Sequence, residues 1–197
     1  MVRILDIEKY AKENHIPIML HDGIDFLCTF IKEKQVKKIL EIGSAIGYSS
    51  IKMALLSSDI HVTTIERDNE RYEIALKNIN DFKLENQIKI INDDVFNIDL
   101  DEKFDLIFID GAKSQYIKFF EKFDKNLKTN GYIISDNLSF HGLVESNEYI
   151  ESRNVRGLVR KIRNYIEFLK NNERYETLFY EIGDGISVSK KINWYFI

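Results

Sequence analysis

Residues 38–50 of this chain, Lys-Ile-Leu-Glu-Ile-Gly-Ser-Ala-Ile-Gly-Tyr-Ser-Ser, decide its fold. A short apolar strand over residues 39–42 runs into a turn that contains Gly43 and Gly47, and a helix-forming run follows at 51–56. Glycine suits sharp turns and backbone that a ligand approaches closely. A strand, a glycine turn and a helix in this order form the first unit of nucleotide-binding α/β domains.

The spacing of this turn points to a particular kind of ligand. It is Glu41-x-Gly43-x-x-x-Gly47, whereas Gly-x-Gly-x-x-Gly brings a helix N-terminus onto a pyrophosphate. An acid at the strand end suits a cationic ligand, such as the sulfonium and ammonium groups of S-adenosylmethionine, and would repel a pyrophosphate. We therefore expect Glu41 to belong to a site for that cofactor. An ordinary glycine turn of an α/β protein is the alternative.

The composition bounds the class of protein. The 197 residues are 44% hydrophobic and 30% charged, which suits one globular domain spanning 1–197. No apolar run reaches 18 residues, and the first ten residues lack the apolar core of a signal peptide, so we expect a cytoplasmic protein with no membrane partner. Cys28 is the single cysteine, which excludes a disulfide framework. The net charge of −4 argues mildly against nucleic-acid binding, but the distribution of charge matters more.

Periodicity along the chain predicts alternating strands and helices. Residues 3–34 are expected to be helical with a break at Pro17, so that 1–34 form an N-terminal helical cap over the cofactor site. The other expected elements are strands at 60–66, 87–91, 104–110 and 131–137, with helices at 69–80 and 155–170. Two final strands, at 175–182 and 186–190, are joined by Gly183-Asp184-Gly185, and we expect the last to enter the sheet antiparallel.

Two acids at strand ends are candidates for holding a nucleoside. Glu66 ends the second expected strand, 23 residues after Gly43, where an acid accepts hydrogen bonds from both ribose hydroxyls. Its alternative role is to favour the dipole of the following helix. Asp94 follows the third strand and could accept from an adenine amino group, although a polar turn explains it nearly as well.

Oxygen-bearing side chains also end the fourth and fifth expected strands. Asp110, Asp136 and Asn137 would converge if those strands are neighbours, because adjacent strand ends lie about 5 Å apart. Two carboxylates and an amide form the oxygen ligand set that Mg²⁺ prefers. Lys113, one turn after Asp110, could act as a general base there. Capping or solvated acids and a surface lysine are the alternatives.

With these motifs in place, the chain resembles the class I, metal-dependent S-adenosylmethionine O-methyltransferases of the catechol and caffeoyl-coenzyme A type. Within them it most resembles the bacterial branch that methylates 5-hydroxyuridine in the tRNA anticodon loop. The likeness covers roughly residues 15–190. One departure is Asp93-Asp94-Val95, where relatives commonly show Gly-Asp-Ala. The matching stretches are 40–49, 65–68, 108–116, 135–137 and 183–186.

The resemblance implies a Rossmann-like α/β fold with a seven-stranded sheet, helices on both faces and a C-terminal antiparallel hairpin. It implies S-adenosyl-L-methionine and Mg²⁺, or another divalent cation, as cofactors. Lys113 would be the base, and Asp110, Asp136 and Asn137 the metal ligands. The resemblance implies six cofactor residues: Met19, Gly43, Ala45, Ser49, Glu66 and Asp110. Glu41 and Asp94, proposed above from their positions, complete the expected cofactor site.

A basic segment suggests the acceptor. Residues 151–163 carry five basic side chains and one acid, a local net charge of +4. Four arginines recur every three or four residues, so that a helix would present them roughly along one side: Arg153, Arg156, Arg160 and Arg163. We expect the first three to bind RNA phosphates. A solvated helix face is the alternative. Because 5-hydroxyuridine carries vicinal oxygens, as catechol does, we expect tRNA as the partner and 5-methoxyuridine as the product.

Other functions stay open from the sequence alone. The same chemistry on a catechol-like small molecule is the first alternative. A nicotinamide-dependent oxidoreductase is the second, against which the missing third glycine and Glu41 argue. A non-catalytic binding module is the third. We also expect a homodimer.

Overall fold

The computed structural model describes residues 3–146 and 149–192, and within these ranges it contains seven strands. Residues 1–2 and 193–197 of the expected domain lie outside the described residues, as do 147–148. The strands are β1 (Lys38–Ile42), β2 (His61–Glu66), β3 (Ile88–Asn92), β4 (Phe104–Ile109), β5 (Leu127–Ser135), β6 (Tyr175–Tyr180) and β7 (Ile186–Lys191). The helices are α1 (Ile4–Glu13), α2 (His21–Glu33), α3 (Tyr48–Ala54), α4 (Asn69–Asp81), α5 (Tyr116–Phe123) and α6 (Arg153–Lys170).

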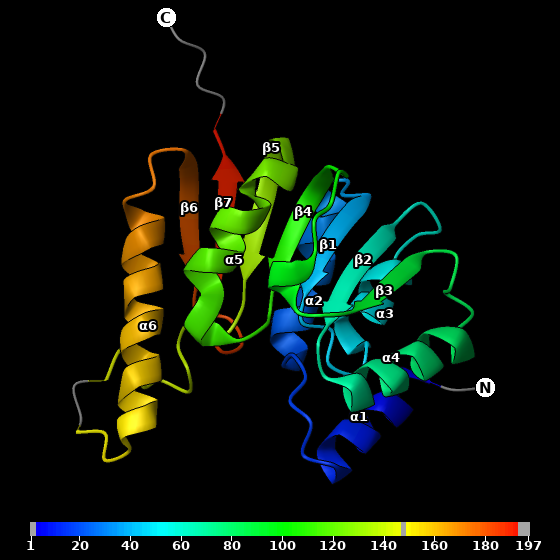
Figure 1. Ribbon diagram of the computed structural model, residues 1–197, viewed down its shortest axis with the longest axis horizontal. Coiled ribbons are helices and arrows are strands. Elements are labelled where there is room, and N and C mark those ends of the chain that lie inside the picture. Colours follow the sequence, from blue (N-terminus) through cyan, green and yellow to red (C-terminus); the bar gives the residue numbers. More distant parts are fainter. Residues whose placement is uncertain (1–2, 147–148, 193–197) are drawn as a thin grey trace, which may run out of the picture.

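The strands form a single mixed sheet in the order β3-β2-β1-β4-β5-β7-β6 (Figure 1). The first five strands are mutually parallel, and β7 pairs antiparallel with both β5 and β6. The expected seven-stranded α/β sheet is confirmed, as is the antiparallel entry of the last strand. Three short 3₁₀ turns complete the described elements, at Val95–Asn97, Lys113–Gln115 and Asp124–Asn126.

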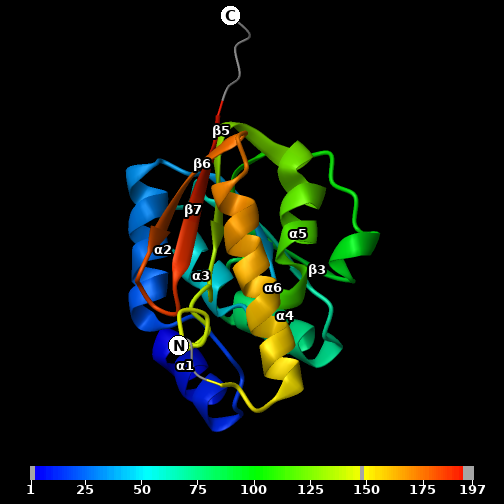
Figure 2. The same cartoon turned by 90° about the vertical axis from the view of Figure 1, so that its left-hand side faces the viewer.

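Helices cover both faces of the sheet (Figure 2). Successive residues of a strand pack into different hydrophobic cores, one on each face. Ile39 packs in the core under α1, α2 and α3, whereas its neighbour Leu40 packs in the core under α5 and α6. Consecutive side chains of a strand point to opposite faces, and a parallel sheet covered on both sides needs apolar residues on each. This is why the central strands are nearly continuous apolar runs.

The carboxyl ends of the parallel strands lie together at one edge of the sheet. Ile109 of β4 pairs with Ser135 of β5, so Asp110 and Asp136 follow at equivalent positions on neighbouring strands. The connection between α1 and α2 and the start of α6 lie at the same edge (Figure 1). Ligands of open α/β sheets bind at this edge, so the fold assembles there the residues that the sequence singled out.

Two expected boundaries differ from the structure by three residues or more, and the other ends differ by two at most. The helix after the first strand begins at Tyr48, because Gly47 adopts a left-handed φ of 82° and serves as its N-cap. Strand β5 spans Leu127–Ser135 and so begins four residues before the expected strand at 131–137. Leu127 pairs with Phe104, and the register then shifts before the regular pairing resumes. This irregularity hides the start of the strand from a periodicity argument.

Among the helices that the structure describes, none has both the length and the apolar character that crossing a bilayer requires.

Candidate active site

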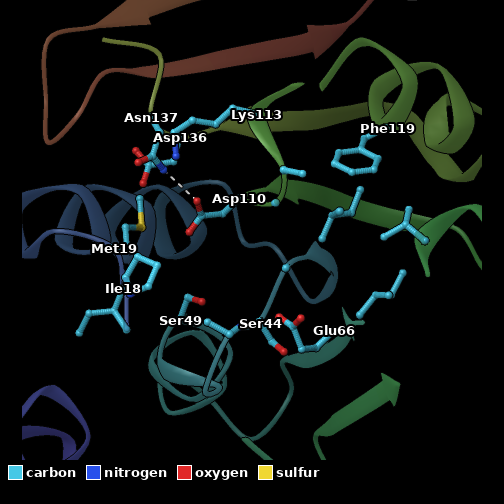
Figure 3. Close-up of a pocket in the computed structure, with 18 of the residues that line it drawn as sticks. Ile18, Met19, Ser44, Ser49, Glu66, Asp110, Lys113, Phe119, Asp136 and Asn137 are labelled. Atoms are coloured by element: carbon cyan, nitrogen blue, oxygen red, sulfur yellow. Dashed lines mark hydrogen bonds between the residues drawn. The ribbon is translucent and has the colours of Figure 1, made fainter. Parts of the chain in front are cut away.

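A cavity of about 580 Å³ opens at the carboxyl edge of the sheet. Its volume lies in the range typical of small-molecule sites. Segments far apart in the sequence form its wall: the linker before α2, the turn after β1, and the ends of β2, β4 and β5 (Figure 3). Most of the residues predicted for the site line it, namely Met19, Gly43, Ala45, Ser49, Glu66, Asp94, Asp110, Lys113, Asp136 and Asn137.

The turn after β1 is held by the carboxylate that ends β2. Glu66 accepts a hydrogen bond of 2.9 Å from the backbone N–H of Ala45 and another of 2.9 Å from that of Asp68. Its side chain is 7% exposed and lines the cavity, so one acid both fixes the turn and faces a ligand. Each carboxylate oxygen has more than one lone pair, so Glu66 retains acceptor capacity for the two hydroxyls of a ribose.

Gly43 is required at its position for a steric reason. Its φ is +94°, and a Cβ there would lie 2.7 Å from the backbone oxygen of Asp110. The turn therefore passes directly against the end of β4 and brings the two halves of the cavity together. Ala45 also has a left-handed φ, of 45°, a conformation that is uncommon for a residue with a Cβ. The backbone hydrogen bond from Ala45 to Glu66 offsets part of that cost.

The structure corrects the expectation that Glu41 contacts a ligand directly. Its side chain is 0% exposed and does not line the cavity. Its carboxylate accepts hydrogen bonds from three hydroxyls: Ser49 at 2.5 Å, Thr64 at 2.6 Å, and Ser50. Burial raises the pKa of Glu41, and the three hydroxyl donors oppose that rise. Glu41 thus joins β1 to the start of α3 beneath the cavity. The sequence shows a strand-end acid but not the direction of its side chain, which is why the expectation is wrong.

Met19 and Asp94 lie at different parts of the cavity wall. Met19, which is buried, contributes from the linker before α2. Asp94 accepts from the backbone N–H of Phe96 at 2.9 Å and lies 3.7 Å from the guanidinium of Arg67. Part of its acceptor capacity is therefore used to form the Val95–Asn97 turn. This supports the polar-turn explanation of Asp94 without removing it from the cavity.

Asp110, Asp136 and Asn137 converge as predicted. The amide nitrogen of Asn137 donates to Asp110 at 2.8 Å (Figure 3). Burial, followed by the neighbouring Asp136 carboxylate, raises the pKa of Asp110 well above its ordinary value. Burial also raises the pKa of Asp136, whose side chain is 3% exposed. Two buried carboxylates beside each other are unfavourable unless a positive charge offsets them.

The residues present fit a divalent cation. The Oδ1 atom of Asp136 is buried with no hydrogen-bond partner among the described residues, and such an atom in a native site calls for an explanation. A cation would satisfy it, with Asp110 and the amide oxygen of Asn137 as further hard donors. Within residues 3–146 and 149–192, no three or more His, Cys, Asp and Glu side chains gather as a metal site. The set here consists of two acids and an amide.

Lys113 lies on the same side of the cavity as Asp136 and Asn137 (Figure 3). Its charge acts to lower the pKa of both Asp110 and Asp136, although burial outweighs it. Its ammonium also lies 5.9 Å from the centre of the Phe140 ring. A position beside the carboxylates and at the cavity wall is compatible with the predicted general base.

Several lining residues had not been predicted. Asp184, in the turn between β6 and β7, is buried, and its Oδ2 atom has no partner among the described residues. The glycines on either side marked it as part of a turn, which hid its place in the cavity. Phe96 and Phe119 stack with ring centres 5.5 Å apart at the far end. The signal available in the sequence was an aromatic residue, Phe96, two positions after Asp94. The other unpredicted lining residues include Ile18, Leu20, Ser44, Arg71, Gln115 and His141.

The basic stretch forms the first half of α6, but its arginines differ in their surroundings. Arg156 donates through one nitrogen to the carbonyls of Ile150 and Glu151, at 2.5 and 2.8 Å. By contrast, Arg153 and Arg160 are exposed, and their side chains make no hydrogen bond or ion pair with other described residues. Of the three predicted RNA ligands, these two have guanidinium groups available in full to a partner.

Comparisons with known proteins agree with this geometry. The family model described as O-methyltransferase matches residues 4–192. The caffeoyl-CoA O-methyltransferase of Populus kitakamiensis is 30% identical over 194 residues, which are 94% of this chain and 82% of the relative.

Two crystal structures are also similar. A Staphylococcus aureus protein provisionally named a caffeoyl-CoA O-methyltransferase is 41% identical with a TM-score of 0.91, over 97% of this chain and 93% of that one. An O-methyltransferase from Bacillus cereus in complex with SAH is 25% identical with a TM-score of 0.78, over 95% and 90%. The family model spans nearly the whole chain, and the fold of the chain matches that of the Staphylococcus aureus structure. This protein is therefore a member of the O-methyltransferase family.

Proposed function

We propose that this protein is an S-adenosylmethionine-dependent and divalent-metal-dependent O-methyltransferase whose acceptor is 5-hydroxyuridine in the tRNA anticodon loop. The observation that carries the proposal is one cavity that contains both the Glu66 carboxylate and the buried, unpartnered Asp136 oxygen beside Asp110. The first suits a ribose, and the second suits a cation that would hold two vicinal oxygens. The SAH complex of the Bacillus cereus relative supports the cofactor assignment.

The cofactor half of the cavity would be built by the turn after β1 and by Glu66. S-adenosylmethionine supplies, when bound, an electrophilic methyl group on a sulfonium. Glu66 would accept the ribose hydroxyls, while Gly43 leaves the space between the turn and the end of β4 that a side chain would fill. Ser49 lines the cavity beside Ser44 of this turn, and Met19 lines it nearer Asp136 (Figure 3). These residues would bind and orient the cofactor, and such positioning is a large part of the rate acceleration in a group transfer.

The acceptor half would be built by Asp110, Asp136, Asn137 and Lys113. A divalent cation supplies, when bound, a Lewis acid that lowers the pKa of an oxygen attached to it. Asp110 and Asp136 would hold that charge, and the buried environment of both carboxylates makes the cation a favourable neighbour. Lys113 would receive the proton that the acceptor hydroxyl gives up as its oxygen forms the new bond to carbon.

The choice of a tRNA acceptor depends on charge and position. Arg153 and Arg160 are exposed on α6, whose first turn lies at the same edge of the sheet as the cavity (Figure 1). RNA phosphates are suitable partners for such arginines, and an anticodon-loop base can be unstacked into a pocket at modest cost. The names of the plant relatives point instead to a small phenolic acceptor. The homodimer remains a prediction.

The test of this function is a methyl-transfer assay with both acceptors. Radiolabelled S-adenosylmethionine is supplied with tRNA that contains 5-hydroxyuridine, with tRNA that lacks it, and with a simple catechol. We expect efficient labelling of the first only, and a double charge reversal at Arg153 and Arg160 should weaken tRNA binding and flatten its salt dependence. Efficient labelling of catechol with none of tRNA would reject the tRNA assignment and favour a small phenol. No labelling of either would reject the whole class of acceptors with two vicinal oxygens.

A second prediction concerns the ribose carboxylate. Replacing Glu66 by alanine should weaken SAH binding by about 10-fold or more, because the charge-assisted hydrogen bonds to ligand hydroxyls are lost. The same change frees the Ala45 N–H and loosens the turn. Calorimetry with SAH measures the effect. Glu70→Ala, in the first turn of α4 and away from the cavity wall, is the matched control and should bind like the wild type. Equal affinity for the Glu66 variant would remove this residue from the cofactor site.

A further inference from the structure

The turn that follows Asn137, residues 138–146, borders the acceptor half of the cavity through His141, and we call it the acceptor-side turn. His141 lines the cavity, and the ring of Phe140 lies under the ammonium of Lys113 at 5.9 Å. The turn therefore connects directly to a candidate metal ligand and contacts the candidate base. Any displacement of it would be felt by both groups.

This turn holds an unfavourable backbone conformation. Asn137, Phe140 and His141 have φ values of 64°, 48° and 59°. Left-handed φ in residues other than glycine costs on the order of 1 kcal/mol each and persists only where the surroundings enforce it. The acceptor-side turn must therefore be anchored from outside.

The tip of the β6–β7 hairpin provides one anchor. The N–H of Leu138 donates to the carbonyl of Gly185 at 3.0 Å, and the N–H of Ser139 donates to that of Asp184 at 2.7 Å. The N–H of His141 donates to the Asp184 carboxylate at 2.5 Å. These bonds fix the first half of the turn, next to Asn137. The second half is tied back to the first by the N–H of Val144, which donates to the carbonyl of Ser139 at 3.0 Å, and it leaves the carbonyls of Val144 and Ser146 directed away from that bond for a partner outside the turn.

Arg163 of α6 provides the second anchor. Its Nε donates to the carbonyl of Val144 at 2.8 Å, and its Nη2 donates to that of Ser146 at 2.8 Å. A guanidinium is a planar fork of donors, which suits two neighbouring carbonyls better than an ammonium does. Arg163 belongs to the same basic stretch as Arg160, but two of its donors are already committed to the backbone of the turn.

We propose that Arg163 is a positioning residue for the acceptor half of the site. It holds the second half of the acceptor-side turn, so that Asn137, Phe140 and Lys113 keep their places. It thereby sets the affinity for the acceptor and the rate of transfer to it, but not the affinity for S-adenosylmethionine. The proposal deepens the proposed function and rests on it for the identity of the acceptor. The basic stretch of α6 thus has two uses, an internal one at Arg163 and an external one at Arg160.

The first experiment does not require activity. Hydrogen exchange followed by mass spectrometry is measured on the full chain with Arg163→Ala, Arg163→Lys and Arg160→Ala. We expect peptides covering 138–146 to exchange about 10-fold faster in Arg163→Ala, because their local opening becomes easier. Arg163→Lys should exchange at a rate between those of the wild type and Arg163→Ala, since a single ammonium nitrogen replaces two guanidinium nitrogens. Arg160→Ala should match the wild type. Unchanged exchange in Arg163→Ala would overturn the proposal, whatever the enzyme methylates.

The second experiment separates acceptor from cofactor. For Arg163→Ala we expect kcat/KM for the acceptor to fall about 10-fold or more, while KM for S-adenosylmethionine and Kd for SAH stay within about twofold. Arg163→Lys should recover part of the loss. If wild-type protein transfers no methyl group to any acceptor, the proposed function fails while the exchange result still stands. Equal losses for acceptor and cofactor would show a general structural role and overturn the proposal.

Discussion

Replacing Asp136 by asparagine is expected to abolish methyl transfer and, at the same time, to raise the melting temperature of the metal-free protein. The two effects have one cause. The Asp136 carboxylate is buried with an unpartnered oxygen, a placement that suits a cation and is unfavourable without one. Its loss should reduce kcat by about a thousandfold or more, because a metal site contributes several kcal/mol to stabilising the transition state.

The gain in stability follows from the direction of the pKa shift. Burial raises the pKa of Asp136 from 3.8 to about 6, so between these values the folded state binds more protons than the unfolded state. Stability therefore falls as pH rises through that window, and the full penalty is present above it. A shift of this size corresponds to about 2–3 kcal/mol, so Asp136→Asn should raise the melting temperature at pH 7.5 by roughly 4–8 °C. At pH 3.5, where Asp136 is mostly protonated in both states, the gain should be small.

Asp105→Asn is the matched control at the opposite end of β4. Burial acts to raise the pKa of Asp105, but hydrogen bonds from Lys128 and from the N–H groups of Lys38 and Lys37 outweigh it and lower that pKa. Its removal should lower the melting temperature at pH 7.5. Thermal scans with EDTA and with MgCl₂ measure both variants, and Mg²⁺ should stabilise the wild type more than Asp136→Asn. EDTA should abolish wild-type activity, and MgCl₂ or MnCl₂ should restore it. Full activity in EDTA would show that these acids are not metal ligands.

Replacing Gly43 by alanine should have the largest effect on the cofactor half. The new Cβ would lie 2.7 Å from the carbonyl oxygen of Asp110 and 3.0 Å from the Cα of Gly111, both of them backbone atoms that cannot rotate away. The φ of +94° adds strain for any residue with a Cβ. We expect a loss of about 3 kcal/mol or more of folding free energy, since both overpacking and backbone strain contribute. SAH affinity should fall about 100-fold, because the turn and the end of β4 must move apart.

Gly142→Ala separates the two contributions. Gly142 has a similar φ of +80°, but a Cβ there would meet nothing within 4 Å. This variant should lose only the strain part, about 1 kcal/mol, and bind SAH as the wild type does. Chemical denaturation and calorimetry measure both variants. If Gly43→Ala were no more destabilised than Gly142→Ala, the close approach of the turn to β4 would not be what makes glycine necessary.

The sequence predicted the sheet well because the local signals and the tertiary fold agree. The central strands are apolar on both faces, the acids fall at their carboxyl ends, and the glycine turn selects one topology. Asp110 and Asp136 could be paired in advance because adjacent parallel strands in register place their ends together. Membership of the O-methyltransferase family then shows that the protein is an enzyme, and it excludes the two alternatives of a nicotinamide-dependent oxidoreductase and a non-catalytic module.

What the sequence could not give was the direction of individual side chains. Glu41 and Glu66 are both strand-end acids, but only Glu66 reaches the cavity, because three hydroxyls from α3 and β2 hold Glu41 beneath it. Likewise, Arg160 and Arg163 look alike in a run of basic residues. Both are exposed, and which of them has its guanidinium committed depends on carbonyls of a turn 17–19 residues earlier in the chain. Such contacts are set by packing between elements and leave no periodic signal.

The order of the strands also has a consequence for how the protein is made. β5 carries Asp136 at its end, and its outer edge is covered only when β7, the last strand in the sequence, pairs with it. During synthesis that edge stays open until the final strand has left the ribosome, and an unpaired strand edge is a template for association with other chains. The part of the cavity around Asp136 and the protection of the nascent sheet are therefore completed by the same late event. Until the closing hairpin docks, a growing chain has the cofactor turn but neither the turn anchors at Asp184 and Gly185 nor a finished acceptor wall.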